Sequence, residues 1–168
     1  MRRIMRTTFI GALILFFAPS AAKPAPHANN LVDFSGTWQM DTSRSESVHF
    51  GGPVVSVTFK IRQTATQVSI ETRQSGQSEI LIYKLDGSES SRPVQANGPV
   101  SWSADWDGEK LVTHTTRYIN GMPVVITETR RLDAKGKQMT LDRTLAVQHG
   151  YGSGQASSMA HDLFVKVL

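Results

Sequence analysis

Regular alternation of apolar and polar residues over short stretches is the feature of this sequence that most limits its fold. The alternation is clear over residues 55–62, 68–71, 100–106 and 139–147. A period of two residues is typical of a β-strand with one buried face, and no window shows a sustained helical period. Further strands are expected over residues 34–41, 79–85, 110–118, 123–132 and 162–168, which brings the total to nine.

The connections between these strands are short. Asp107-Gly108 and Asn120-Gly121 are dipeptides that favour two-residue hairpin turns. A long meander of short strands avoids exposed edges by closing on itself. We therefore expect an all-β fold, an antiparallel up-and-down β-barrel of about eight to ten strands. The Gly- and Ser-rich segment 150–158 predicts a mobile loop before the last strand.

The N-terminus has the pattern of an export signal. Three Arg residues precede an apolar run over residues 9–18, and small residues follow it. The run is shorter than the ~20 residues that a membrane-spanning helix needs, which favours cleavage after Ala22 over a membrane anchor. We predict a signal peptide (1–22), a disordered leader (23–31), a barrel domain (32–168) and a periplasmic or secreted protein with no membrane span after cleavage.

The composition excludes several classes of function. The chain has 168 residues, which suits one domain, and it has no Cys, so a disulfide scaffold, a thiolate metal site and a Cys nucleophile are ruled out. The formal net charge is +4, but residues 1–22 hold three Arg and no acidic residue, so the mature net charge is +1. No basic stripe with interleaved aromatic residues follows, so nucleic acid is not an expected partner.

The turn dipeptides predict which residues face each other. A two-residue turn at Asn120-Gly121 pairs Thr113 with Glu128. A similar turn at Asp107-Gly108 makes Asp105 and Lys110 neighbours, which predicts a cross-strand ion pair.

The third hairpin is expected to turn through a four-residue loop over 133–136. This loop pairs Met139 with Arg130 and Arg143 with Ile126. A three-residue loop would turn Met139 toward solvent, because a slip of one residue moves every side chain to the other face.

The predicted interior is not purely apolar. The face with Trp102 and Trp106 must be the inner one, because exposing both indoles would leave a large apolar area in water. One interpretation is an internal salt-bridge network that fills the barrel. The other is a pocket for a small ligand with a carboxylate or other anionic group, which the planar fork of Arg binds well. The candidate ligand-binding residues are Trp102, Trp106, Arg117, Glu128, Arg130 and Arg143.

The opening of the barrel domain resembles a known family. Phe34-Ser35-Gly36-Thr37-Trp38, with Asp41 and Ser43-Arg44-Ser45 after it, resembles the start of lipocalin-like (calycin) barrels. The remainder, through residues 106–112 to residues 162–166, is similar to small exported bacterial members of unknown function. The resemblance implies that Gly36 and Trp38 close one barrel end and that a late-strand Arg, best matched by Arg143, packs on the indole.

A weaker resemblance is to streptavidin-type barrels. It rests on Trp38, on the spacing from Trp102 to Trp106, and on the run His161-Asp162-Leu163-Phe164. Those proteins enclose biotin with further Trp residues from later strands, whereas residues 123–147 of this chain hold none. Biotin is therefore not the expected ligand.

Other chemistry has little support in the sequence. The five His residues form no metal-binding pair, no nucleophile elbow is present, and Glu128 stands as the one carboxylate of its face. His114 falls on the outer face, and the rim or the outside is the expected place of Tyr83, Tyr118 and Tyr151. No catalytic residue, metal or cofactor is predicted.

Two classes of function remain, and the sequence leaves the oligomeric state open. The first is an exported binding protein that holds a small hydrophobic or carboxylate ligand in the barrel. The alternative is a filled barrel that acts as an interaction or inhibitor protein of the cell envelope; an enzyme ranks third. The interior volume separates the first two, since a cavity of ~300 Å³ or more supports a binder.

Overall fold

The computed structural model describes residues 31–47, 55–93, 98–147 and 156–167, and these form strands and turns without a helix. No helix in the described part is thus long and apolar enough to cross a membrane. The predicted signal peptide and almost all of the leader lie outside the described residues. The strands are β1 (Gly36–Met40), β2 (Val57–Gln63), β3 (Gln67–Gln74), β4 (Gln77–Lys84), β5 (Ser90–Ser91), β6 (Pro99–Asp107), β7 (Lys110–Ile119), β8 (Met122–Leu132), β9 (Gln138–Val147) and β10 (Ala156–Val167).

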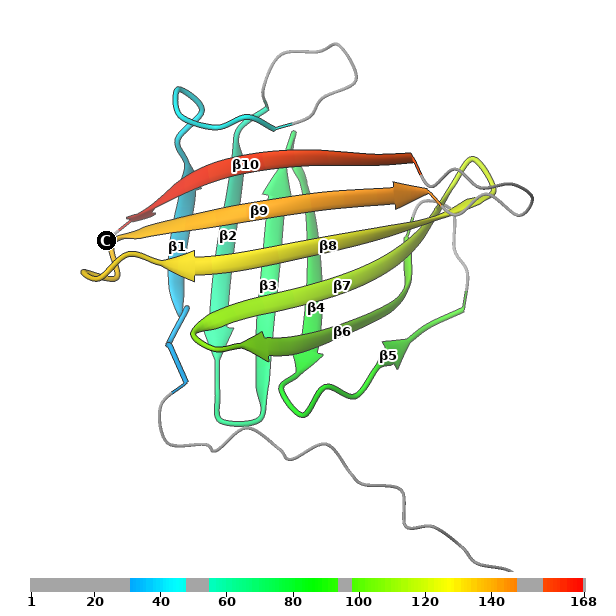
Figure 1. Cartoon of the computed structure of the whole chain (residues 1–168), viewed down its shortest axis with the longest axis horizontal. Helices are drawn as coiled ribbons and strands as arrows, with labels where there is room; N and C mark the ends of the chain where they lie inside the picture. The colour runs from blue at the N-terminus through cyan, green and yellow to red at the C-terminus, as the bar shows by residue number, and fades with distance from the viewer. Residues whose placement is uncertain (1–30, 48–54, 94–97, 148–155, 168) are drawn as a thin grey trace, which may run out of the picture.

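All ten strands belong to one antiparallel sheet that curls into a nearly closed barrel, which confirms the predicted fold class. The order in the sheet is β4-β3-β2-β1-β10-β9-β8-β7-β6-β5. Figure 1 shows β1–β4 crossing behind the long strands β6–β10, so the two halves enclose a common interior. The strand absent from the prediction is β5, whose two residues are too few to show an alternation.

The turn between β7 and β8 confirms the predicted register in full. Asn120 and Gly121 have φ angles of 51° and 76°, as a type I′ turn requires. Thr113 consequently lies opposite Glu128, as expected.

The turn between β6 and β7 begins one residue later than predicted. Its two residues are Gly108 and Glu109, because Asp107 pairs with Lys110. Gly108 has a φ of 61°, and a glycine in the first turn position is what a type II′ turn needs. The expected ion pair of Lys110 with Asp105 is therefore wrong: Lys110 Nζ lies 3.0 Å from Asp107 Oδ2. From Ser101 to Asp107, each β6 residue pairs two positions later than predicted, which leaves the inner and outer faces of this stretch unchanged. The register shifts between Pro99 and Ser101.

The loop between β8 and β9 is also displaced by one residue, to residues 134–137. The Asp133 amide donates to the carbonyl of Gln138 at 2.9 Å. Asp133 Oδ1 accepts hydrogen bonds from the backbone N–H groups of Lys137 and Gln138, at 2.7 and 2.8 Å. The Asp133 side chain therefore fixes the start of the loop. The pairing of β9 moves by two residues, and Met139 stays buried on the inner face as predicted.

Apolar side chains fill one end of the barrel. Trp38 is fully buried, and its Nε1 donates to the carbonyl oxygen of Phe34 at 2.9 Å. The Phe34 ring lies 6.1 Å from that of Trp106. The expected burial of Trp38 is thus confirmed, and this end of the barrel is closed.

The cation on the Trp38 indole is Lys166, and the prediction of Arg143 in this place is wrong. Lys166 Nζ lies 5.2 Å from the ring centroid. The last strand pairs Lys166 with Trp38 but Ala160 with Arg143, so Arg143 lies well along the sheet toward the other end of the barrel.

The last strand is longer than the sequence indicates. Its first residue, Ala156, pairs with Val147, so residues 156–158 belong to β10 and the prediction of a loop there is wrong. Residues 150–155 of the predicted loop lie outside the described residues.

Candidate functional site

A cavity of about 640 Å³ occupies the half of the barrel opposite the Trp38 end. Residues of the β3–β4 turn border it, so it opens at that end of the molecule. Its apolar lining consists of Val57, Phe59, Ile70, Leu81, Ile126 and Leu145. Its polar lining consists of Ser47, Thr72, Gln74, Ser75, Gln77, Ser78, Glu79, Tyr83, Thr115, Arg117, Glu128, Arg130 and Arg143.

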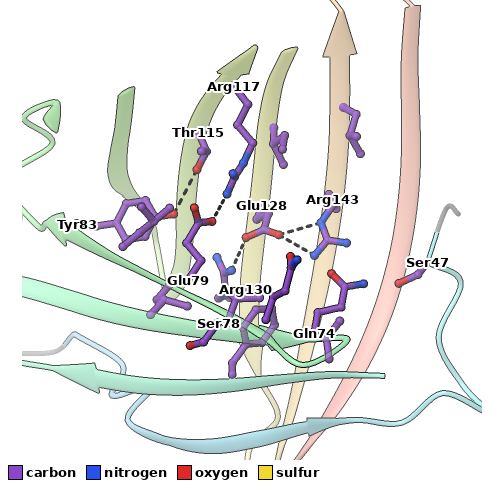
Figure 2. A pocket seen from close by; sticks show the side chains of 18 of the residues that line it. Ser47, Gln74, Ser78, Glu79, Tyr83, Thr115, Arg117, Glu128, Arg130 and Arg143 are labelled. Atoms are coloured by element: carbon purple, nitrogen blue, oxygen red, sulfur yellow. Dashed lines mark hydrogen bonds and ion pairs between the residues drawn. The ribbon is translucent and has the colours of Figure 1, made fainter. Parts of the chain in front are cut away.

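Most of the charged residues that line the cavity come from inner positions of β7, β8 and β9, which are neighbours in the sheet. Going inward from the β7–β8 turn, the inner positions of β8 are Val124, Ile126, Glu128 and Arg130, because side chains alternate between the two faces. Arg143 of β9 lies directly opposite Glu128. Figure 2 shows the side chains of Glu128, Arg130 and Arg143 pointing into the same space.

Glu128 is the centre of the charged cluster. One of its carboxylate oxygens accepts a hydrogen bond from Arg130 Nη2. The other lies 2.8 Å from both Nε and Nη2 of Arg143. Burial disfavours the ionised form of Glu128, but the two guanidinium groups outweigh this effect and lower its pKa to about 2. Glu128 is therefore a carboxylate throughout the physiological range.

Arg130 forms the buried base of the cavity. Only 1% of its side chain is exposed, its Nη1 donates to Thr113 Oγ1 at 2.8 Å, and its guanidinium lies 5.3 Å from the centroid of the Phe59 ring. Its Nε is buried and makes no hydrogen bond within the described part of the chain.

Arg143 connects Glu128 to a second buried carboxylate, Asp162 of β10. The distance from Arg143 Nη1 to Asp162 Oδ2 is 3.7 Å, and Asp162 is only 1% exposed. The hydroxyl of Ser47 donates to the same Asp162 oxygen at 2.6 Å. Burial lowers the pKa of Arg143, whereas Glu128 and Asp162 raise it, and the net effect is a raised pKa.

Side chains close the side of the barrel where the backbone ladder is interrupted. The sheet ends at β4, and Glu79 of this edge strand pairs with Arg117 of β7 (Figure 2). Tyr83 of β4 shares a hydrogen bond of 3.3 Å with Thr115. We call these contacts between β4 and β7 the seam.

Two further contacts reinforce the seam. Trp102 Nε1 donates to the carbonyl of Ile82 at 2.8 Å. Arg92 lies 3.5 Å from Glu79 Oε1 and also covers the Trp102 ring, at 5.7 Å from its centroid.

The structure brings together four of the six predicted ligand-binding residues, namely Arg117, Glu128, Arg130 and Arg143. Trp102 and Trp106 lie on the inner face, as predicted, but they do not border the cavity. Trp102 reinforces the seam, and Trp106 packs at the closed end. The prediction that both indoles line one wall with the Arg residues is therefore wrong, because Trp102 bonds to β4 and Trp106 packs near Phe34.

Three important residues were missed or misplaced by the sequence analysis. Glu79 and Asp162 were not assigned to the interior, and Tyr83 is 3% exposed rather than on the rim. A signal for β4 was present: Ser75-Gly76 is a turn dipeptide, and its φ angles of 51° and 77° form a two-residue turn. This turn alone places Glu79 opposite Thr72, and both line the cavity.

The arrangement suits binding better than acid–base catalysis. The expectation that Glu128 stands alone is wrong, because Glu79 also lines the cavity. The lowered pKa of Glu128 keeps this carboxylate ionised near neutral pH, so Glu128 does not suit the role of a general acid. The described residues contain no cluster of three or more residues that suits a metal ion.

Comparisons with known proteins identify the fold. No family model matches the chain, and no curated protein matches its sequence. The structure is similar to an SAHS protein from Ramazzottius varieornatus (14% identity, TM-score 0.58, 79% of this chain and 94% of that chain covered). It is also similar to the apo form of lipid binding protein 8 from Caenorhabditis elegans (14%, 0.55, 80% and 95%) and to human cRBP IV (16%, 0.53, 81% and 99%). These likenesses support the lipocalin-like barrel that Gly36 and Trp38 indicated, and they show the fold alone.

Proposed function

We propose that this chain is an exported binding protein that holds a small, partly apolar ligand with an anionic group inside its barrel. The observation that carries the proposal is the cavity of about 640 Å³, which exceeds the ~300 Å³ of a minimal ligand site. Its apolar wall suits the body of an amphipathic molecule. The guanidinium groups of Arg130 and Arg143 suit a carboxylate at its buried end.

Two further observations support parts of this proposal. The pattern of residues 1–22 supports export. A structural neighbour, the C. elegans protein, is a lipid binding protein, which supports an amphipathic ligand in a barrel of this shape.

The cavity also weighs against the alternative of a filled barrel. Apolar side chains pack the half with Trp38 and Phe34, whereas the half with Arg143 keeps an open space. A structural barrel gains nothing from leaving this volume unfilled, because interiors normally pack densely.

Isothermal titration calorimetry of the mature protein with a panel of fatty acids and aromatic acids tests the proposal. We expect one binding site for at least one monocarboxylate. Arg143→Ala should weaken that binding by roughly tenfold or more, the scale of a hydrogen bond to a charged group. Arg143 is preferred to Arg130 for this test, because it is 23% exposed and its removal disturbs the core less.

Arg73→Ala is the matched control. Arg73 pairs with Glu71 at 2.6 Å on the outer face of β3, away from the cavity. We expect this variant to bind as the wild type does. No heat of binding across the panel, or equal affinity of the wild type and the Arg143 variant, would reject the proposal and favour the filled-barrel interaction protein.

A further inference from the structure

The wall of the cavity holds a second cationic position, which the protein neutralises with its own carboxylate. Arg117 lies above the base of the cavity, and Glu79 forms an ion pair with it across the seam. The same carboxylate lies 3.5 Å from Arg92. The Glu79 side chain is 33% exposed and extends to this position from β4, the strand at one edge of the sheet.

The charges of the lining are unevenly divided between base and wall. At the base, Glu128 is shared by Arg130 and Arg143. At the wall, Glu79 faces Arg117. Three guanidinium groups and two carboxylates thus border the cavity among the described residues. Asp162, which does not border the cavity, lies 3.7 Å from Arg143 and balances the second guanidinium group of the base.

We propose that Glu79 determines ligand specificity by restricting the cavity to amphiphiles with a single anionic group. This inference rests on the proposed function and adds the class of ligand to it. The acid group of the ligand binds at the base, near Arg143, and its apolar part lies along Ile126 and Leu145. A second acid group would meet the Glu79 carboxylate at the wall.

This selectivity follows from the free-energy cost of placing two like charges close together in a partly dehydrated cavity. Two carboxylates that share one site repel each other far more strongly in a protein interior than in water. Glu79 therefore excludes dianionic molecules such as α,ω-dicarboxylates. Without the charge of Glu79, a second acid group would no longer be repelled at the wall.

The experiment compares monocarboxylates with dicarboxylates of equal length. Octanoate, dodecanoate, octanedioate and dodecanedioate are titrated calorimetrically into the wild type, Glu79→Gln and Glu71→Gln. Glu71→Gln removes a carboxylate that also pairs with an Arg but lies on the outer face of β3. Gln keeps the size of Glu and removes only its charge.

The wild type should bind the better monocarboxylate at least roughly tenfold more tightly than the matching dicarboxylate. Glu79→Gln should reduce this ratio by roughly tenfold, mainly because the dicarboxylate binds more tightly. Glu71→Gln should keep the ratio of the wild type. An unchanged ratio in a Glu79→Gln protein that still binds the monocarboxylate would overturn the inference.

Two outcomes separate this inference from the proposed function. If the wild type binds neither type of acid, the proposed function fails. If Glu79→Gln does not fold, Arg117→Gln takes its place. With Glu79 still present and one of its two guanidinium partners removed, dicarboxylate binding should weaken further relative to the monocarboxylate. A gain in dicarboxylate binding by Arg117→Gln would contradict the assigned role of Glu79.

Discussion

Glu128 and Arg143 lie directly opposite each other on β8 and β9, and their side chains form an ion pair of 2.8 Å inside the barrel. The pair exists because the Asp133 side chain fixes the start of the preceding loop. A change in loop length by one residue would turn Arg143 to the outside. The register of one hairpin thus determines whether the cavity has a cationic base.

The pairing makes stability depend on pH in the acid range. The pKa of Glu128 is about 2 in the folded protein, below its ordinary value of 4.5. Glu128 therefore contributes stability that is complete above pH 4.5 and is lost as the pH falls toward 2. In Glu128→Gln this loss should be absent, so the fall in stability across that range should be shallower.

Urea unfolding midpoints between neutral pH and pH 2 check this prediction. Glu109→Gln, a change in the exposed β6–β7 turn, is the control and should keep the pH dependence of the wild type. Equal slopes for the wild type and Glu128→Gln would show that the ion pairs of Glu128 do not stabilise the fold.

Trp38 should be the most costly single truncation at the closed end. Its side chain is fully buried and anchored to the Phe34 carbonyl. Trp38→Ala should lower the free energy of unfolding by ~3–5 kcal/mol, as for other large core truncations. A chemical melt measures this change, and a loss below ~1 kcal/mol would contradict the closure of the barrel by this residue.

Gly36 should be required for two separable reasons. Its φ of 144° is unfavourable for other residues, and a Cβ added there would lie 2.5 Å from Lys166 Cε. Gly36→Ala should destabilise the protein by ~1–3 kcal/mol. In a Lys166→Ala background the clash disappears and only the backbone strain remains, so the two changes should be non-additive in a double-mutant cycle. Strict additivity would mean that Lys166 moves aside without cost.

The export prediction is tested on the N-terminus of the mature protein. Expression with the intact sequence in a host with signal peptidase should yield a chain that begins at or near Lys23. Edman sequencing of the exported fraction reads this directly. A chain that keeps residues 1–22 and stays in the cytoplasm would exclude export and, with it, a periplasmic or extracellular ligand.

The inward and outward faces were predictable where a turn sequence is unambiguous. Asn120-Gly121 places both residues at positive φ, and it gave the pairing of Thr113 with Glu128 correctly. Asp107-Gly108 was ambiguous, because one glycine fits either of two turn types. The error moved the pairing by two residues, and an even shift keeps the faces although it changes the partners.

The parts of the site that come from distant strands were not predictable in this way. Glu79 meets Arg117 only because the barrel closes, and no local pattern relates β4 to β7. The same holds for Asp162, which reaches Arg143 through the pairing of β9 with β10. The volume of the cavity could not be predicted from the sequence either, because it depends on how all the inner side chains pack.

Native mass spectrometry of the mature protein purified from its own host tests directly whether the barrel holds a ligand. We expect a single bound molecule, an amphipathic acid, whose added mass is absent or strongly reduced in Arg143→Ala. Incubation of the stripped protein with dodecanoate should restore one adduct per chain. A bare polypeptide mass from the host, together with no uptake of dodecanoate, would show that the barrel does not bind an amphipathic acid.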